Sequence, residues 1–159
     1  MSKKHICLVL LAVLVSLTAC RTSLGTTASY HSYPTECISQ NVDGKMLLRV
    51  WATGEFSKDA IREAEKKALD DIIFKGITMG ASNRSQIALL VEGNARQKYE
   101  DYFLRFFADG GDYKNYVSRD KSHINAVERT KNKGTKSRGI IVLVDVPALK
   151  ARLKQDGII

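Results

Sequence analysis

Hydrophobic and polar residues alternate with a period of two along residues 46–54. Leu48, Val50 and Ala52 would share one face of a strand there, and the residues between them would share the other face. Gly54 then interrupts the alternation. We therefore predict that the first clear strand of a folded domain ends at this glycine.

The period changes to that of a helix after Ser57, a residue type that favours the N-cap position. Beyond it, apolar residues recur three and four positions apart, with charged residues between them. The apolar positions are Ile61, Ala64, Ala68, Leu69, Ile72 and Ile73. Gly76 suits the left-handed residue that often follows a helix. This pattern predicts an amphipathic helix that packs on a sheet.

An aromatic stripe with helical spacing predicts a second helix over residues 95–108. Its members are Tyr99, Tyr102, Phe103, Phe106 and Phe107. A stripe of this kind usually packs into a core, although a ligand-binding face has the same spacing. Residues 78–94 have no clear period, and we expect a loop there with a short buried segment at residues 87–91.

Loose alternation over residues 116–131 predicts a second strand, and residues 132–135 have the composition of a hairpin turn. Residues 140–146 are apolar on both faces apart from Asp145, so we expect a central or covered third strand. Pro147 suits the first turn of a closing helix. Asp145 is expected to cap that helix, and a functional role is the alternative.

Together these segments predict an α+β fold with the element order β-α-α-β-β-α, in which helices cover a small antiparallel sheet of three or four strands. A fourth strand would come from residues 36–43. The length predicts a single domain over residues 37–159. Residues 20–36 are rich in Ser, Thr, Gly and Tyr, and we interpret them as a lipidated cysteine followed by a tether.

The first residues have the order of a secretory signal, with a short basic start and an apolar run that ends at Leu17. The run is shorter than the ~20 residues of a membrane-spanning helix, so a permanent transmembrane anchor is the weaker interpretation. Residues 17–20 resemble the lipobox of bacterial lipoproteins, Leu-x-Ala/Gly-Cys. The resemblance implies that residues 1–19 are a signal peptide and that Cys20 receives a diacylglycerol and acyl chains such as palmitate. An ordinary cleaved signal with a chance cysteine is the alternative.

The residues after the cysteine indicate which membrane would hold the protein. In enterobacterial lipoproteins an aspartate directly after the cysteine retains the protein in the inner membrane, and this chain has Arg21 there. Residues 21–24 also lack the acidic run that resembles a surface-export signal in Bacteroidota. The resemblance therefore implies a lipid-anchored protein in the outer membrane that faces the periplasm.

The formal net charge of +8 limits the class of partner. A basic chain often binds nucleic acid, but an exported lipoprotein rarely meets it, so anionic lipid, cell-wall polymers and acidic envelope proteins remain. Five cations and no acid occur along residues 129–138. They are Arg129, Lys131, Lys133, Lys136 and Arg138. This stretch is either a solvated hairpin tip or a contact for an anionic partner or membrane.

The sequence contains few candidate catalytic residues. Cys37 is the only cysteine left once Cys7 is removed with the signal and Cys20 is lipidated. It should be buried or, less commonly, paired with another chain. Catalytic residues, metal ligands and cofactors are not expected, because zinc spacings, a nucleophile elbow and a Walker loop are all missing from the sequence. The remaining enzyme alternatives are a Cys37–His123 pair or two carboxylates.

The acidic residues of the first helix region are interpreted as solvated surface charge. They are Glu55, Asp59, Glu63, Asp70 and Asp71.

Two segments resemble a known family. The strand that ends at Gly54 and its alanine-rich helix, and the last strand that leads into Pro147 and Leu149, are similar to the small domain of LPP20-type lipoproteins. The N-terminal domain of the flagellar assembly protein T is similar too. The match covers residues 46–77 and 138–158, and the segment between them departs from it.

The segment that departs, with its aromatic residues and Asp109-Gly110-Gly111, resembles small lipoproteins of Bacteroidota. Some of these belong to envelope-spanning machines, including a type VI secretion system. The resemblance implies a structural subunit without catalytic residues. We therefore expect a non-catalytic adaptor or structural subunit of a cell-envelope, secretion-type assembly. A stand-alone binding module for cell wall or a small ligand is the alternative, and an enzyme comes third.

Overall fold

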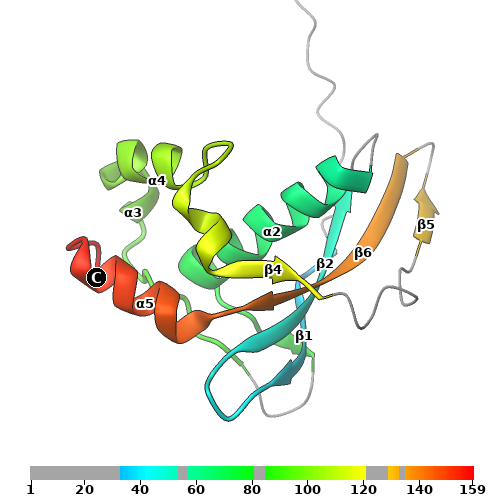
Figure 1. Ribbon diagram of the computed structural model, residues 1–159, viewed down its shortest axis with the longest axis horizontal. Helices are drawn as coiled ribbons and strands as arrows, with labels where there is room; N and C mark the ends of the chain where they lie inside the picture. The colour runs from blue at the N-terminus through cyan, green and yellow to red at the C-terminus, as the bar shows by residue number, and fades with distance from the viewer. Residues whose placement is uncertain (1–32, 54–56, 81–84, 121–128, 133–134) are drawn as a thin grey trace, which may run out of the picture. The chain divides into compact units, whose positions relative to one another are not determined.

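The computed structural model describes residues 33–53, 57–80, 85–120, 129–132 and 135–159, and the structural statements below concern these residues. The strands are β1 (Glu36–Gln40), β2 (Met46–Thr53), β3 (Met79–Gly80), β4 (Val117–Arg119), β5 (Arg129–Asn132) and β6 (Thr135–Val144). The helices are α2 (Ser57–Phe74), α3 (Ala95–Lys98), α4 (Glu100–Phe106) and α5 (Val146–Gln155), with a 3-10 helix, η1 (Asp112–Asn115). Figure 1 shows their arrangement.

The described residues form a six-stranded sheet with the order β3-β1-β2-β6-β4, in which β5 also pairs with β6. The pairs β1–β2, β2–β6, β4–β6 and β5–β6 are antiparallel, whereas β1 and β3 are parallel. The expected α+β class is confirmed. The expected purely antiparallel sheet of three or four strands is wrong, and so is the expected element order β-α-α-β-β-α. The two residues of β3 are too few to have a detectable period, and the second helix and the second strand are each divided into two elements.

Helix α2 packs on one face of this sheet (Figure 1). Residues of β2 alternate between buried and half-buried along the whole strand, as its sequence pattern predicts. On the buried face, Leu48 lies opposite Val142 of β6, and both are fully buried. Ala64 and Ala68 of α2 are also fully buried, and their small side chains let the helix approach the strands closely. The core therefore lies between β2, β6 and α2.

The expected second helix is divided into α3 and α4 at Tyr99, whose φ and ψ are −115° and 28°. Backbone hydrogen bonds still cross the division, from Tyr99 to the carbonyl of Ala95 and from Phe103 to that of Tyr99. The aromatic stripe therefore keeps one common face, and its interpretation as core is confirmed. Phe103 and Phe106 are buried, and the ring of Phe103 lies 4.8 Å from that of Phe74 in α2.

The predicted C-terminal end of α2 and the predicted cap of α5 are confirmed. Gly76 has φ of +79° after α2, and its amide donates to the carbonyl oxygen of Asp71 at 2.7 Å. The Asp145 carboxylate accepts a hydrogen bond from the amide of Ala148 at 3.0 Å, so this aspartate caps α5. Pro147 occupies the first turn of that helix. The caps satisfy backbone groups that a helix end leaves without a partner.

The expected hairpin is confirmed, because β5 pairs with β6 through Asn132 opposite Thr135. The strand expected over residues 116–131 appears as two pieces, β4 and β5, which both pair with β6. The last strand begins at Thr135, earlier than its apolar run suggests, and Val146 belongs to α5 instead. Pairing with β2 and β5 extends β6 beyond the residues whose hydrophobicity predicts it.

The described fold begins a few residues before the expected boundary at residue 37. The ring of Tyr33 lies 4.9 Å from that of Trp51, and Thr35 is buried. The signal sequence and Cys20 lie outside the described residues. Among the helices that the structure describes, none combines the length and the apolar character needed to cross a membrane.

Candidate functional site

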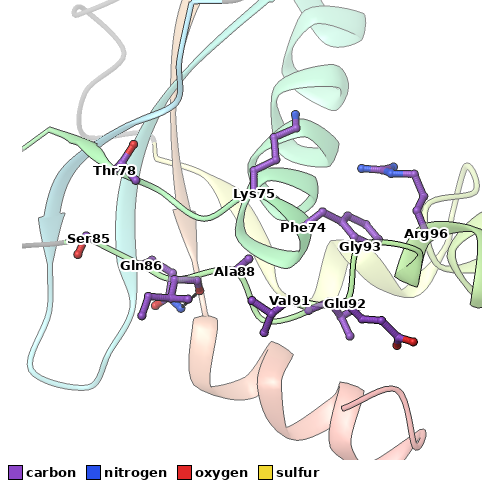
Figure 2. Close-up of a pocket in the computed structure, with 12 residues that line it drawn as sticks. Phe74, Lys75, Thr78, Ser85, Gln86, Ala88, Val91, Glu92, Gly93 and Arg96 are labelled. Atoms are coloured by element: carbon purple, nitrogen blue, oxygen red, sulfur yellow. Dashed lines mark hydrogen bonds between the residues drawn. The ribbon is translucent and has the colours of Figure 1, made fainter.

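A groove of about 630 Å³ lies at the C-terminal end of α2, between the last turn of this helix and the segment of residues 85–93 (Figure 2). Its walls include Phe74, Lys75 and Thr78 on one side and Gln86, Ala88 and Arg96 on the other. The sequence alone does not predict it, because residues 78–94 have no clear period.

The segment 85–93 is held against the end of α2 by backbone hydrogen bonds. The amides of Leu89 and Leu90 donate to the carbonyl oxygens of Ile72 and Ile73, at 3.1 and 2.8 Å. These carbonyl oxygens belong to the last turn of α2, and no later residue of the helix can donate a hydrogen bond to them. Leu90 is buried, so its side chain anchors the segment in the core.

Two large apolar side chains of this segment are exposed beside the groove. Ile87 is 76% exposed and Val91 is 83% exposed. The expectation of a short buried segment over residues 87–91 is therefore right for Leu90 and, in part, for Ala88 and Leu89, which are half-buried. Hydrogen bonding to the helix end decides which residues turn inward, and this long-range contact leaves no periodic signal in the sequence. Met79 of the edge strand β3 is also 50% exposed.

The cations that line the groove are paired with carboxylates of α2. The guanidinium of Arg96 contacts the Asp70 carboxylate at 2.7 Å and lies 4.1 Å above the ring of Phe74. The ammonium of Lys75 contacts the Asp71 carboxylate at 2.7 Å. Their charge is therefore already compensated within the domain. The groove offers apolar contact surface with a polar rim, which is the composition of a protein-contact site.

Asp71 is buried, with 4% exposure, so its interpretation as a solvated surface charge is wrong. The hydroxyl of Thr35 and the ammonium groups of Lys67 and Lys75 all donate to its carboxylate. Burial raises the pKa of this carboxyl, but the three hydrogen bonds outweigh burial and hold the pKa below its usual range. Asp71 thereby fixes the chain before β1 to α2. The lysines four residues before and after it are the sequence signal for this pairing.

The other acidic residues of this region differ from Asp71. Asp59, Glu63 and Asp70 are half-buried, and Glu55 lies outside the described residues. Half-burial raises the pKa of the Glu63 carboxyl, although hydrogen bonds with Thr53 oppose this effect. These positions are compatible with surface charge that contacts neighbouring side chains.

The structure brings four of the five expected basic residues together. In the β5–β6 hairpin, Arg129 lies opposite Arg138, and Lys131 lies opposite Lys136. Lys133 belongs to the turn and lies outside the described residues. The sequence reveals the charge of this stretch, but only the strand register reveals that basic residues occupy directly opposed positions.

Cys37 is buried, with 2% exposure, as the more common outcome for a lone cysteine predicts. Its thiol contacts the carbonyl oxygen of Ser39 at 3.7 Å. His123, the base in the alternative nucleophile pair, lies outside the described residues. Within the described ranges, no three His, Cys, Asp or Glu residues come together as a metal site would require.

Comparison with known proteins gives no match to a family model and no significant match to a curated protein or a solved structure. The resemblance to LPP20-type and Bacteroidota lipoproteins therefore stays a prediction. The function proposed below is based on the geometry of the groove.

Proposed function

We propose that this protein is a lipid-anchored adaptor of the bacterial cell envelope without catalytic activity. Cys20 would carry the lipid in the outer membrane, and the folded domain would face the periplasm. There it would hold another envelope protein, in an assembly of the secretion type. The single observation that supports the adaptor role is the exposure of Ile87 and Val91 on a segment that the core holds in place.

Burial of these two side chains would contribute favourably to a contact with another protein. Burial of one large aliphatic side chain contributes about 1.5–3 kcal/mol. Binding usually loses part of such a gain because loops must become ordered. Here the backbone of Leu89 and Leu90 is already bonded to α2, which reduces that loss. An exposed apolar pair on a preorganised segment is typical of an interaction surface.

The alternative is a module that binds a small ligand or a piece of cell wall. The volume of about 630 Å³ favours it, since ligand pockets commonly measure roughly 300–1,000 Å³. A small ligand, however, gains affinity from apolar groups that enclose it, and Ile87 and Val91 are largely exposed. Both cations of the groove are also paired within the domain, so an anionic sugar would have to displace a carboxylate. The adaptor role is therefore the better supported of the two.

The anchor is tested by replacement of the proposed lipidated residue. Cells that express the full chain or its Cys20→Ser variant are fed a labelled fatty acid, and their membranes are separated by density. We expect label on the wild type and its recovery with the outer membrane, and neither result for the variant. Equal labelling of both proteins, or a wild type without label, would refute the anchor.

The contact surface is tested with a photocrosslinking amino acid at position 87 and, as a matched control, at position 42. Val42 is also fully exposed, but it lies in the turn between β1 and β2. We expect one discrete crosslinked partner from position 87 and none from position 42. The same partner should copurify in stoichiometric amount with a Val42→Asp variant and be lost from an Ile87→Asp/Val91→Asp variant. Equal recovery with both variants would contradict the adaptor role.

A further inference from the structure

The sheet has a second face, opposite the one on which α2 packs. Three pairs of directly opposed residues on β2 and β6 form its centre. They are Leu47 with Leu143, Arg49 with Ile141, and Trp51 with Gly139. The members on β2 alternate with the buried core residues of that strand, so they lie on the far side of the sheet from α2. We call this surface the open face.

The described helices all pack on the other side of the sheet. Each contributes a residue to the core that includes the inward face of β2, namely Ala64 of α2, Ala95 of α3, Phe103 of α4 and Leu149 of α5. Ile141 is also buried, with 6% exposure, yet it lies outside this core. An antiparallel sheet whose second face meets water usually has polar residues there. Apolar residues at the centre of the open face indicate that another surface covers it.

The two ends of the open face differ in shape. At one end the ring of Trp51 lies over Gly139, where an added Cβ would be 3.6 Å from the ring atoms. The ring of Tyr33 lies 4.9 Å from that of Trp51 and adds to this aromatic end. At the other end, Leu47 and Leu143 have smaller, half-buried side chains. A two-fold axis across the strands would set the aromatic end of one copy on the leucine end of another, so the face is complementary to itself.

The charges at the centre of the open face are also balanced. The guanidinium of Arg49 contacts the carboxylate of Glu36 at 3.2 Å, and these two residues are directly opposed on β2 and β1. A surface of one charge, such as an anionic bilayer or an acidic protein, would attract one of them and repel the other. A second copy presents the same cation and anion in exchanged positions. Charge therefore favours a second copy as the occupant.

We propose that two copies of this chain associate through their open faces, with the two sheets packed face to face. Sheets in such an arrangement lie about 10 Å apart, and the side chains between them interdigitate. The interface would not use the groove, because the groove is formed by the last turn of α2 and the segment beyond it. A dimer would therefore present two grooves. The inference goes beyond the proposed function and does not depend on the lipid anchor.

The size of the face limits the strength of the dimer. The eight residues of β2 span about 27 Å, and the strands β1, β2, β6 and β4 together are about 19 Å wide. The open face therefore covers at most roughly 500 Å² per copy. Two such faces reach about 1,000 Å², which is the lower limit for a specific interface. The dimer should be reversible, so covalent capture is the suitable measurement.

The test expresses the full chain in cells with a photocrosslinking amino acid at position 47 or, as a matched control, at position 104. Leu104 is also a leucine and is 65% exposed, but it belongs to α4. We expect a product with twice the mass of the chain from position 47 and none from position 104. With two coexpressed copies that carry tags of different size, a mixed product should also form. Peptide mapping should place the attachment point on β2 or β6 of the second copy.

A second substitution tests the aromatic end. In the chain with the crosslinker at position 47, Trp51→Ala should lower the yield of the doubled product roughly tenfold, because aromatic residues often dominate such interfaces. The matched control is Tyr99→Ala, which removes a half-buried aromatic ring on the helix side. It should keep the yield of the parent chain. Circular dichroism checks that both variants are folded.

Several outcomes would overturn the inference. A product of another mass from position 47 would show that the open face contacts a different protein, and attachment to lipid alone would show a membrane contact. No product from position 47, or equal amounts of doubled product from positions 47 and 104, would also refute the dimer. If Trp51→Ala does not fold, the mass of the product from position 47 and its mapped attachment point decide by themselves.

Discussion

Charged residues are arranged differently near the two ends of α2. At the groove end, Arg96 and Lys75 contact carboxylates of the helix, and apolar side chains remain exposed. At the hairpin end, the register sets Lys131 opposite Lys136 and arginine opposite arginine. The groove end therefore contains ion pairs within the fold, whereas the hairpin brings residues of like charge into register. The difference teaches that one domain can pair its cations with carboxylates in one place and align residues of one charge in another.

The largest expected effect concerns Asp71 at the groove end. An Asp71→Ala variant leaves the ammonium groups of Lys67 and Lys75 close together without their carboxylate. We expect the free energy of unfolding to fall by about 3 kcal/mol, since removal of one partner of a buried ion pair is strongly destabilising. Urea denaturation followed by circular dichroism measures this. A loss below about 1 kcal/mol would show that the cluster does not hold the groove end together.

The same residue predicts an acid dependence. The pKa of Asp71 in the folded protein is below its usual value, so the ionised carboxylate adds stability above the unfolded pKa of about 3.9. That stability is lost as pH falls through the folded pKa. Between about pH 5 and pH 3, the wild type should lose more stability than an Asp71→Asn variant. Parallel pH curves for the two proteins would contradict the assigned hydrogen bonds.

The next effect concerns the attachment of the segment 85–93. Leu90 is its buried residue, and Leu90→Ala should lower the free energy of unfolding by about 2–3 kcal/mol. The amides of Leu89 and Leu90 should also exchange their hydrogens faster, because their bonds to α2 would open more often. Amides of β6 serve as the internal control. Unchanged exchange at both positions would mean that Leu90 does not anchor the groove.

A smaller effect is expected from charge reversal at the groove. Arg96→Glu replaces an ion pair with Asp70 by repulsion and removes the contact with the ring of Phe74. Because Arg96 is largely exposed, we expect a loss of only about 1 kcal/mol. Thermal unfolding at low and high salt measures it. The difference from wild type should shrink at high salt, and a difference independent of salt would contradict an electrostatic cause.

The smallest expected effect is a gain in the free energy of unfolding, and it tests the comparison between the groove and the hairpin most directly. Lys136→Glu in the hairpin replaces a pair of like charges with a pair of opposite charges. We expect the free energy of unfolding to rise by about 0.5 kcal/mol, because opposite charges on directly opposed strand positions attract each other. Thermal unfolding measures this change. A loss of stability in the variant would contradict the register that sets Lys131 opposite Lys136.

Local signals in the sequence predict much of this fold. The alternation along β2, the amphipathic pattern of α2 and the cap at Asp145 each depend on neighbours within a few residues, and each is confirmed. The strand β3 and the division at Tyr99 are missed. The strand β3 arises from pairing with β1, far away in the sequence, and its two residues are too short to show a period.

The candidate sites are predicted less completely. The basic stretch is evident from composition, and Cys20 from its resemblance to the lipobox. The groove and the buried state of Asp71 are not evident, because a helical carboxylate between lysines usually faces solvent. Contact with Thr35, far away in the sequence, buries this one.

The sequence by itself determined the α+β class, the principal strand and helix, and the position of the positive charge. These follow from hydrophobic period and composition, which are properties of the chain before it folds. Only the tertiary structure decided that Ile87 and Val91 remain exposed and that cations oppose cations in the hairpin. Both depend on which distant backbone groups pair, and in the hairpin a one-residue change of register would remove the opposition of cations.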